Sequence, residues 1–574
     1  MYPKKELAQL LISACTQYQI ETVVISPGSR NAPLTIGFSN HPKINALSIV
    51  DERCAAFFAL GIAQQTQKPV AIVCTSGSAL LNYYPAIAEA FYSNVPLVVI
   101  SADRPKHLID IGDGQTIRQE NVFENHILFS ANLIEDSKDV TPSKFEKHNL
   151  KLISEALHIA ISKKGPIHIN VPFDEPLYET VNELQDVIAN KVSQSLKEQI
   201  TSSLTPPNNK IDFDKLSDIW NTATKKMILV GVHYPNEAIQ NAINFFAEDE
   251  SVIILTETTS NLHHKNCINA IDQLIFSLDD AQKKALHPEV LITFGGMVVS
   301  KRIKRFLRDH KPKHHWHIDT QKAVNTFHCL SEFIKVDPPK FLSELKEASI
   351  KTPTFLSGSS VFYQQKWLAI RAHKRIKHQE YLADLPHSDL KVFEQVFAGI
   401  PDNYQLQISN SSVIRYAQLF NLNTTLRVFC NRGTSGIDGS TSTAIGAAFV
   451  SQSPTVFVTG DLSFFYDSNA LWNSAIKKNF RIIIINNASG GIFRIIPGPK
   501  NTNALDYFET PHNLTAEHLC KMHQFEYCFA SSTAKLTSVL TSFYQEGNQP
   551  KILEIFTDKE LNEQQLTTYF NFLK

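Results

Sequence analysis

The sequence lacks the features that mark membrane-spanning, secreted and nucleic-acid-binding proteins. No stretch approaches the roughly 18 consecutive apolar residues that a membrane-spanning helix requires. Polar residues such as Glu6 and Gln9 interrupt the first apolar run, so we expect no signal peptide. Lys and Arg number 55 against 56 Asp and Glu, and this balance argues against nucleic-acid or membrane partners.

Patterned cysteine and histidine ligands are also missing. The eight cysteines are scattered and form no C-x-x-C pair, which argues against a disulfide framework or a zinc site. His263-His264 and the histidines between His310 and His317 lack cysteine or carboxylate partners at local spacing, so we expect structural histidines there. These absences together predict a soluble, cytoplasmic protein with free thiols.

What the chain does have is apolar material for several cores. The chain has 574 residues, which is too long for one domain. Of these residues, 43% are hydrophobic and 19% are charged. Strands alternate with helices in three successive blocks, which we place at residues 1–185, 186–345 and 346–574. This alternation predicts an α/β protein of three successive doubly wound parallel-sheet domains, with a linker near Pro206-Pro207-Asn208-Asn209.

Polar residues follow two strongly apolar strands of the third block. Val456–Thr459 ends in Gly460-Asp461, and Arg481–Ile485 ends in Asn486-Asn487. The two pairs lie one strand–helix–strand unit apart, so adjacent parallel strands would bring both to the carboxyl edge of the sheet. A carboxylate and an amide oxygen suit Mg²⁺ shared with a diphosphate, although helix capping explains the same residues.

Glu52 begins an apolar helix of the first block. The helix contains Cys54, Ala55, Ala56 and Phe58, so we expect it to be deeply buried. A carboxylate at such a position is suited to general acid or base chemistry. The alternative is a charge that merely complements the helix dipole.

Glu52, Gly460-Asp461 and Asn486-Asn487 together resemble the thiamine-diphosphate-dependent enzymes, over the whole chain. The resemblance implies a pyrimidine-binding domain with Glu52, a central α/β domain, and a diphosphate- and metal-binding domain. It also implies that Glu52 hydrogen-bonds the aminopyrimidine ring of the cofactor. Because the two halves of the site would come from different subunits, it implies a homodimer or a dimer of dimers.

Further motifs resemble the branch of this family that consumes isochorismate in menaquinone biosynthesis. They are SPGSRNAPL (Ser26–Leu34), SADRP (Ser101–Pro105), IRQ (Ile117–Gln119), GPIHINVPFDEPLY (Gly165–Tyr178), NRGTSGIDG (Asn431–Gly439) and GDLSFFYD (Gly460–Asp467). The resemblance implies decarboxylation of 2-oxoglutarate and conjugate addition of the succinyl carbanion equivalent to isochorismate.

The resemblance also implies a set of site residues. Thiamine diphosphate would contact Glu52, Asn410, Ser411, Ser435, Gly436, Ile437, Gly460, Asp461, Leu462, Ser463 and Asn487, with Ile437 bending the cofactor. Mg²⁺ or Mn²⁺ would be held by Asp461, Asn487 and the carbonyl of Ser489.

Both substrates are dianions, which need guanidinium groups as partners. The catalytic set would be Glu52, Arg30, Arg104, Gln115, Arg415 and Arg432, and the substrate-binding set Ser29, Lys301, Arg302, Ile492, Phe493 and Ile496. The segment of Lys301 and Arg302 could equally be an exposed basic helix.

The sequence departs from the motifs of this family at two places, and two alternative functions remain. Ala488 and Ser489 interrupt the expected asparagine–glycine metal loop, and Gly114 stands where a polar residue is expected. Another thiamine-diphosphate decarboxylase or carboligase, or a non-catalytic cofactor-binding relative, remains open. No histidine pair, common near the cofactor in the decarboxylases, occurs in the first block.

Overall fold

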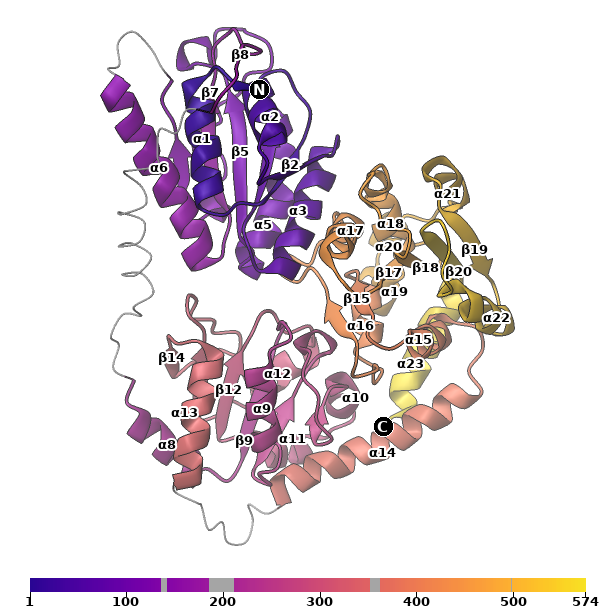
Figure 1. The fold of residues 1–574 in the computed structure, drawn as a ribbon. Coiled ribbons are helices and arrows are strands. Elements are labelled where there is room, and N and C mark those ends of the chain that lie inside the picture. The colour runs from indigo at the N-terminus through magenta and orange to yellow at the C-terminus, as the bar shows by residue number, and fades with distance from the viewer. Residues whose placement is uncertain (136–141, 185–210, 352–361, 497) are drawn as a thin grey trace. The chain divides into compact units, whose positions relative to one another are not determined.

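The computed structural model describes residues 1–135, 142–184, 211–351, 362–496 and 498–574. Three six-stranded parallel sheets form its framework, one in each predicted block (Figure 1). The three-block α/β architecture predicted from the sequence is therefore confirmed. The domain boundaries stay predictions, and the predicted linker lies outside the described residues.

Residue contacts divide the chain into two compact units. The first unit holds the N-terminal region together with Asn431–Gln452 and Ser463–Phe480. The second holds the central region, Ser453–Leu462 and Arg481–Lys574. Each unit is described by itself below.

The first sheet lies in the first unit and has the strand order β3-β2-β4-β5-β7-β6. Its strands are β2 (Thr22–Ile25), β3 (Asn45–Ser48), β4 (Val70–Cys74), β5 (Leu97–Asp103), β6 (Ser130–Asn132) and β7 (Ile167–Pro172). Its helices are α1 (Glu6–Gln17), α2 (Ala32–Asn40), α3 (Glu52–Thr66), α4 (Ala79–Asn82), α5 (Tyr84–Ser93) and α6 (Pro142–Lys163). Two short strands, β1 (Tyr2–Pro3) and β8 (Thr180–Val181), pair antiparallel beside it. Helices α1, α2 and α6 cover one face, where their apolar side chains form one core with the strands.

The segment after β4 forms two helices rather than one. Helix α4 ends and α5 begins at Tyr83. Pro85 lies in the first turn of α5, and its missing N–H cannot continue a helix from the preceding turn.

The second sheet has the order β11-β10-β9-β12-β13-β14. Its strands are β9 (Lys226–Val230), β10 (Val252–Leu255), β11 (Cys267–Ile268), β12 (Val290–Phe294), β13 (His314–Ile318) and β14 (Glu332–Ile334). Helices α8 (Phe213–Thr222), α9 (Glu237–Phe246) and α13 (Pro338–Lys351) pack on one face. Helices α10 (Ile271–Ile275), α11 (Asp280–Leu286), α12 (Lys301–Asp309) and the long α14 (Tyr363–Ala383) pack on the other.

The third sheet has the order β16-β15-β17-β18-β20-β19. Its strands are β15 (Gln405–Ile408), β16 (Arg427–Phe429), β17 (Thr455–Gly460), β18 (Arg481–Asn486), β19 (Glu526–Ala530) and β20 (Lys551–Phe556). The other helices of the third block are α15 (Asp389–Gly399), α16 (Ser412–Ala417), α17 (Ser440–Val450), α18 (Asp461–Tyr466), α19 (Ile492–Ile495), α20 (Ala504–Glu509), α21 (Glu517–His523), α22 (Thr533–Phe543) and α23 (Lys559–Phe572). Of these, α17 and the residues of α18 from Ser463 on belong to the first unit. The two apolar strands predicted from the sequence are β17 and β18, and they pair in parallel as expected.

Two helices of the first unit touch through their backbones. A Cβ atom added at Gly61 of α3 would lie 2.1 Å from the carbonyl oxygen of Thr443 in α17. A Cβ atom added at Gly446 of α17 would lie 2.0 Å from the carbonyl oxygen of Phe58 in α3. Only glycine allows so close an approach, so the two residues fix how α3 and α17 pack.

Among the described residues, no helix combines the length and the apolar character needed to cross a bilayer.

Candidate functional site

The paired ends of β17 and β18 bring Asp461 and Asn487 together. Asp461 follows β17 directly and Asn487 follows β18 directly, and both side chains are buried. Asp461 Oδ2 and Asn487 Oδ1 both accept a hydrogen bond from the backbone N–H of Ser489, each at 3.2 Å. The two oxygens therefore converge on one point at the carboxyl edge of the third sheet.

Neighbouring carboxylates hold the asparagine loop in place. Asn487 Nδ2 donates to Asp389 Oδ2 at 3.3 Å, which leaves Asn487 Oδ1 turned toward Ser489. Burial raises the pKa of Asp389 to about 6. Asn486 Nδ2 donates to the fully buried Glu554 at 2.7 Å, and Glu554 also accepts from Thr515 and Tyr527.

These residues fit a magnesium-bound diphosphate. An aspartate and an amide oxygen are hard ligands of the kind Mg²⁺ prefers, and two or three protein ligands leave coordination positions for phosphate oxygens. Beside them, a Cβ atom added at Gly460 would have Val413 as its one neighbour within 4 Å among the described residues, at 3.8 Å, so this backbone is little crowded. The described ranges contain no group of three or more His, Cys, Asp or Glu side chains that could hold a metal by themselves.

Two details bear on the predicted metal and cofactor contacts. The carbonyl of Ser489, predicted as a metal ligand, accepts a hydrogen bond from Gly491 at 3.0 Å. Asp461 is also the first residue of α18 and accepts from the N–H of Leu462 at 2.7 Å. His512 Nε2 lies 3.4 Å from Asp461 Oδ2.

The segment after β15 lies beside Gly460, since Val413 is the nearest neighbour of that glycine. Ser411 has φ 67° and ψ −126°, a conformation that non-glycine residues rarely adopt. Such a strained residue is a marker of functional positions. Arg415 Nη1 donates to the carbonyl of Ser411 at 2.6 Å, and Asn410 is buried and accepts from Cys430.

Arg302 is not a free surface cation. Its guanidinium lies over the rings of Phe276 and Phe570, 4.3 and 4.8 Å from their centroids, and 4.0 Å from Asp272. Burial raises the pKa of Asp272, while Arg302 and Arg415 oppose this, so both arginines lie near one carboxylate. Lys301, by contrast, is exposed.

The apolar wall predicted after the metal loop is half-buried. Ile492 and Phe493 lie in α19 and Ile496 follows it, with the Phe493 ring 5.1 Å from that of Phe508. Arg494 forms a bidentate ion pair with Glu509, which connects this segment to α20.

In the first unit, Glu52 begins α3 as predicted. Asp51 caps the helix by accepting from the N–H of Cys54, and Asn82 Nδ2 donates to Glu52 at 3.3 Å. Burial raises the pKa values of the Cys54 and Cys74 thiols, which agrees with a packing role for both.

Arg30 and Arg104 lie close together at the ends of β2 and β5. Arg30 is buried and donates to the carbonyl of Phe173 at 2.9 Å. Burial and the neighbouring Arg104 lower the pKa of Arg30. Arg104 pairs with Asp113 at 3.2 Å. Ser29 and Gln115 are exposed, and the backbone of Gln115 lies against Gly77.

The loop Asn431–Gly439 also belongs to the first unit. Glu89 of α5 accepts from the N–H groups of Gly433 and Thr434, at 2.7 and 2.6 Å, and so holds the loop that carries the buried Arg432. Further along, Ser463 donates to the carbonyl of Ile437 at 3.1 Å. Ser435 and Gly436 lie between these two anchored points, and Ser435 has a left-handed φ of 63°.

Sequence reasoning missed the carboxylates that support these loops. Asp389 and Glu89 gave no signal, because each looks like an ordinary residue of an amphipathic helix. Glu554 did leave one, since it is a charge inside the apolar strand KILEIF. Asp467 supports the start of α3: it accepts from the N–H and hydroxyl of Ser442 at 2.7 and 2.9 Å and from the Cys54 thiol at 3.5 Å.

Comparison with known proteins places this arrangement in a family. Three family models match: the thiamine pyrophosphate enzyme N-terminal TPP binding domain over residues 5–128, the middle domain of thiamine pyrophosphate over 194–403, and the thiamine pyrophosphate enzyme C-terminal TPP binding domain over 410–555. The chain is 54% identical to 2-succinyl-5-enolpyruvyl-6-hydroxy-3-cyclohexene-1-carboxylate synthase of Flavobacterium johnsoniae, with 100% of both chains covered.

Two further relatives carry the same name. The one from Christiangramia forsetii is 51% identical, with 100% of both chains covered. The one from Porphyromonas gingivalis is 35% identical, with 100% of this chain and 98% of the relative covered. The chain therefore belongs to the 2-succinyl-5-enolpyruvyl-6-hydroxy-3-cyclohexene-1-carboxylate synthase family of thiamine-diphosphate-dependent enzymes.

Proposed function

We propose that the chain decarboxylates 2-oxoglutarate and adds the resulting succinyl group to isochorismate, giving 2-succinyl-5-enolpyruvyl-6-hydroxy-3-cyclohexene-1-carboxylate and CO₂ in menaquinone biosynthesis. The observation that carries the proposal is the convergence of Asp461 Oδ2 and Asn487 Oδ1 on the Ser489 N–H, beside the little-crowded backbone of Gly460. The names of the full-length relatives support the choice of substrates.

Thiamine diphosphate supplies an electron sink for the decarboxylation when it is bound. Asp461, Asn487 and the Ser489 carbonyl would hold Mg²⁺ or Mn²⁺, which anchors the diphosphate. Asn410, Ser411, Gly460, Leu462 and Ser463 would line the same cofactor site. Ser435 and Gly436 would complete it, and Ile437 would supply its bulky apolar contact.

Glu52 would exchange a proton with the aminopyrimidine ring. Its carboxylate is fixed at the first residue of α3 and accepts one hydrogen bond from Asn82, so it is oriented before any ligand arrives. General acid–base catalysis of this kind needs a held carboxylate within hydrogen-bond reach of the exchanging proton.

The arginines would bind the carboxylates of the two substrates. Arg415 and Arg432 would bind the succinyl part, and Arg30, Arg104, Lys301 and Arg302 the isochorismate part, with Ser29 and Gln115. The interaction of Arg30 with Arg104 supports this, because burial and the charge of Arg104 lower the pKa of Arg30 and a bound anion would stabilise its charged form. Ile492, Phe493 and Ile496 would form the apolar wall.

We further propose a homodimer or a dimer of dimers acting in the cytoplasm. Light scattering coupled to size-exclusion chromatography measures the assembly directly, and a monomer with full activity would contradict the shared site.

The experiment that tests the function is isochorismate consumption with 2-oxoglutarate, with and without thiamine diphosphate and Mg²⁺. Consumption that needs every component, with CO₂ release and the succinyl adduct seen by mass spectrometry, would support the proposal. Cofactor-dependent CO₂ release without isochorismate consumption would indicate another decarboxylase or carboligase of the family. Bound cofactor with neither activity would indicate a non-catalytic relative.

A further inference from the structure

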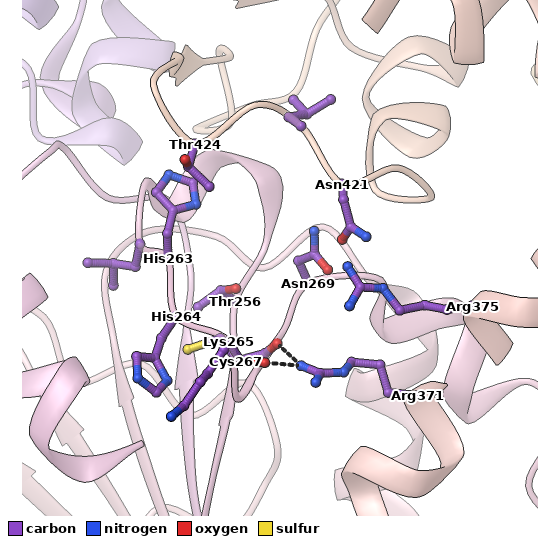
Figure 2. A pocket seen from close by; sticks show the side chains of 12 residues that line it. Thr256, His263, His264, Lys265, Cys267, Asn269, Arg371, Arg375, Asn421 and Thr424 are labelled. Carbon is purple, nitrogen blue, oxygen red and sulfur yellow. Dashed lines mark hydrogen bonds between the residues drawn. The ribbon is translucent and has the colours of Figure 1, made fainter. Parts of the chain in front are cut away.

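The second unit contains a cavity of about 370 Å³ that none of the predicted site residues line (Figure 2). It lies at the β11 edge of the second sheet, against helix α14 and the loop between α16 and β16. Its lining residues are Thr256, Leu262, His263, His264, Lys265, Cys267, Asn269, Arg371, Arg375, Asn421, Leu422 and Thr424.

The lining carries positive charge and no carboxylate. Lys265, Arg371 and Arg375 contribute three cations, and no Asp or Glu is among the lining residues. Lys265 and His264 both contact Glu248, outside the lining, at 3.1 and 3.2 Å. The positive charge of the cavity that no such contact compensates is therefore that of Arg371 and Arg375.

The two arginines are the unusual feature. They stand four residues apart on α14, where like charges repel. Burial and the nearby Arg375 lower the pKa of Arg371. Within the ranges that the structure describes, neither guanidinium has a carboxylate within 4.0 Å. A pair of cations kept together without a counter-ion indicates a place for an anion.

Arg371 is held in position for such a ligand. Its Nη1 donates to the carbonyl oxygens of Lys265 and Cys267, at 2.7 and 2.8 Å, shown as dashed lines in Figure 2. Its Nε is buried and makes no hydrogen bond in the described part of the chain. In Figure 2, Arg375 projects from the same helix toward Asn421 and Asn269.

We propose that this cavity is a binding site for a small organic phosphate, distinct from the proposed active site. Guanidinium forks match phosphate oxygens, and one dianionic phosphate would compensate both arginines at once. Asn269, Asn421 and Thr424 supply further polar groups, and Leu262 and Leu422 supply apolar surface for the rest of the molecule. The volume exceeds the need of a free phosphate ion and falls in the range of small-molecule sites.

A ligand here would join two parts of the second unit. Thr256 precedes Glu257, whose carboxylate accepts from the N–H groups of Val299 and Ser300 just before α12. The loop with Asn421 and Thr424 follows α16, which carries Arg415. Binding would therefore cross-link segments from two sheets and raise the thermal midpoint of the protein.

Titration calorimetry of the enzyme saturated with thiamine diphosphate and Mg²⁺ tests the site. The probes are glycerol 3-phosphate and malonate, at constant ionic strength. We expect one glycerol 3-phosphate per chain, and a loss of affinity of at least about tenfold in Arg375→Gln. Lys366→Gln removes an exposed charge of the same helix outside the cavity and should bind as the parent does.

Several outcomes would overturn the proposal. They are the absence of saturable glycerol 3-phosphate binding, unchanged affinity in Arg375→Gln, and an equal loss in Lys366→Gln. Tighter binding of malonate than of the phosphate would overturn the assignment to a phosphate. If Arg375→Gln does not fold, by circular dichroism, the exposed Lys265→Gln takes its place and should also weaken binding.

Discussion

The first and third sheets share one topology and carry different chemistry. Numbered along the chain within each sheet, the strands run 2-1-3-4-6-5 in both, whereas the second sheet runs 3-2-1-4-5-6. The ends of the third and fourth strands therefore occupy equivalent places. In the first sheet these strands end at Cys74 and Asp103, and in the third at Gly460 and Asn486.

The polar groups at these equivalent ends are used differently. In the first sheet Gln119 donates to Asn170 and accepts from the N–H of Gly77, while Asn170 donates to Asp103 at 2.7 Å. That network connects its members to one another. In the third sheet Asp461 and Asn487 accept from the same N–H, beside the little-crowded backbone of Gly460. The scaffold is common to both, and a few residues at the strand ends decide what it binds.

The comparison predicts that the edge of the third sheet and the surroundings of α3 have different roles. Variants at the edge of the third sheet should lose cofactor binding, whereas variants around α3 should keep binding and lose turnover or stability. Four substitutions test this difference, from the largest expected effect to the smallest.

Asp461→Ala should abolish Mg²⁺-dependent binding of thiamine diphosphate, because it removes the only charged metal ligand of the predicted set. Quenching of protein fluorescence on titration with cofactor, with and without Mg²⁺, measures this. Asp384→Ala, an exposed carboxylate of the same unit, is the control and should bind normally. Normal Mg²⁺-dependent binding in Asp461→Ala would remove the basis for the metal site.

Glu52→Gln should bind cofactor with unchanged affinity and lose about 10²- to 10⁴-fold in kcat, the usual contribution of a general acid or base. The change keeps the shape of the side chain and its contact with Asn82. Steady-state kinetics and the same fluorescence titration separate the two effects. Glu21→Gln, exposed and paired with Lys68, should leave both unchanged. Full activity of Glu52→Gln would rule out the proposed role.

Asp389→Ala should weaken the apparent affinity for Mg²⁺ by about 10- to 100-fold, as is typical when the partner that orients a metal ligand is removed. Asn487 would then lose the acceptor that turns its oxygen toward Ser489. Asp389→Asn retains one acceptor oxygen and should lose less. Equal Mg²⁺ affinity in all three proteins would mean that the orientation of Asn487 does not depend on Asp389.

Asp467→Asn should change how the free energy of unfolding depends on pH and should leave cofactor binding unchanged. Burial raises the pKa of Asp467 from 3.8 to about 7. The carboxyl group of Asp467 binds its proton more tightly in the folded chain than in the unfolded chain. The protonated carboxyl therefore stabilises the fold fully below pH 3.8, and this stabilisation is lost as the pH rises through about 7. The slope in between is at most about 1.4 kcal/mol per pH unit.

Unfolding measured from pH 4 to 8 checks this last expectation. Asp467→Asn should flatten the decline in the free energy of unfolding, and Glu124→Gln, exposed on the same unit, should not. An unchanged decline would show that Asp467 is not the group responsible.

The parts of the fold that the sequence predicted well are those with strong apolar patterns. Strands β17 and β18 are almost wholly apolar and buried, and their ends identified Asp461 and Asn487. Strands β14 and β19 were not predicted, because they lie at sheet edges and each has only one buried residue. Short edge strands depend on their neighbours rather than on a pattern of their own.

The candidate site could be predicted where polar side chains directly follow apolar strands, as Asp461 and Asn487 do. Its supporting contacts could not be predicted, because Asp389 approaches Asn487, and Glu89 approaches Gly433, from residues far away along the chain. The stacking of Arg302 between Phe276 and Phe570 has the same origin. The local sequence around Arg302 is that of a basic helix, and only tertiary packing shows that its partly exposed guanidinium lies against two aromatic rings.

The backbone contacts at Gly61 and Gly446 limit which substitutions the interface between α3 and α17 can accept. At most interfaces a larger side chain on one element is absorbed by a smaller one on its partner. Here no side chain intervenes, and the obstructing atoms are main-chain carbonyl oxygens that substitution cannot trim. Changes in the surrounding side chains therefore cannot accommodate a larger residue at either glycine, because α3 and α17 would have to move apart.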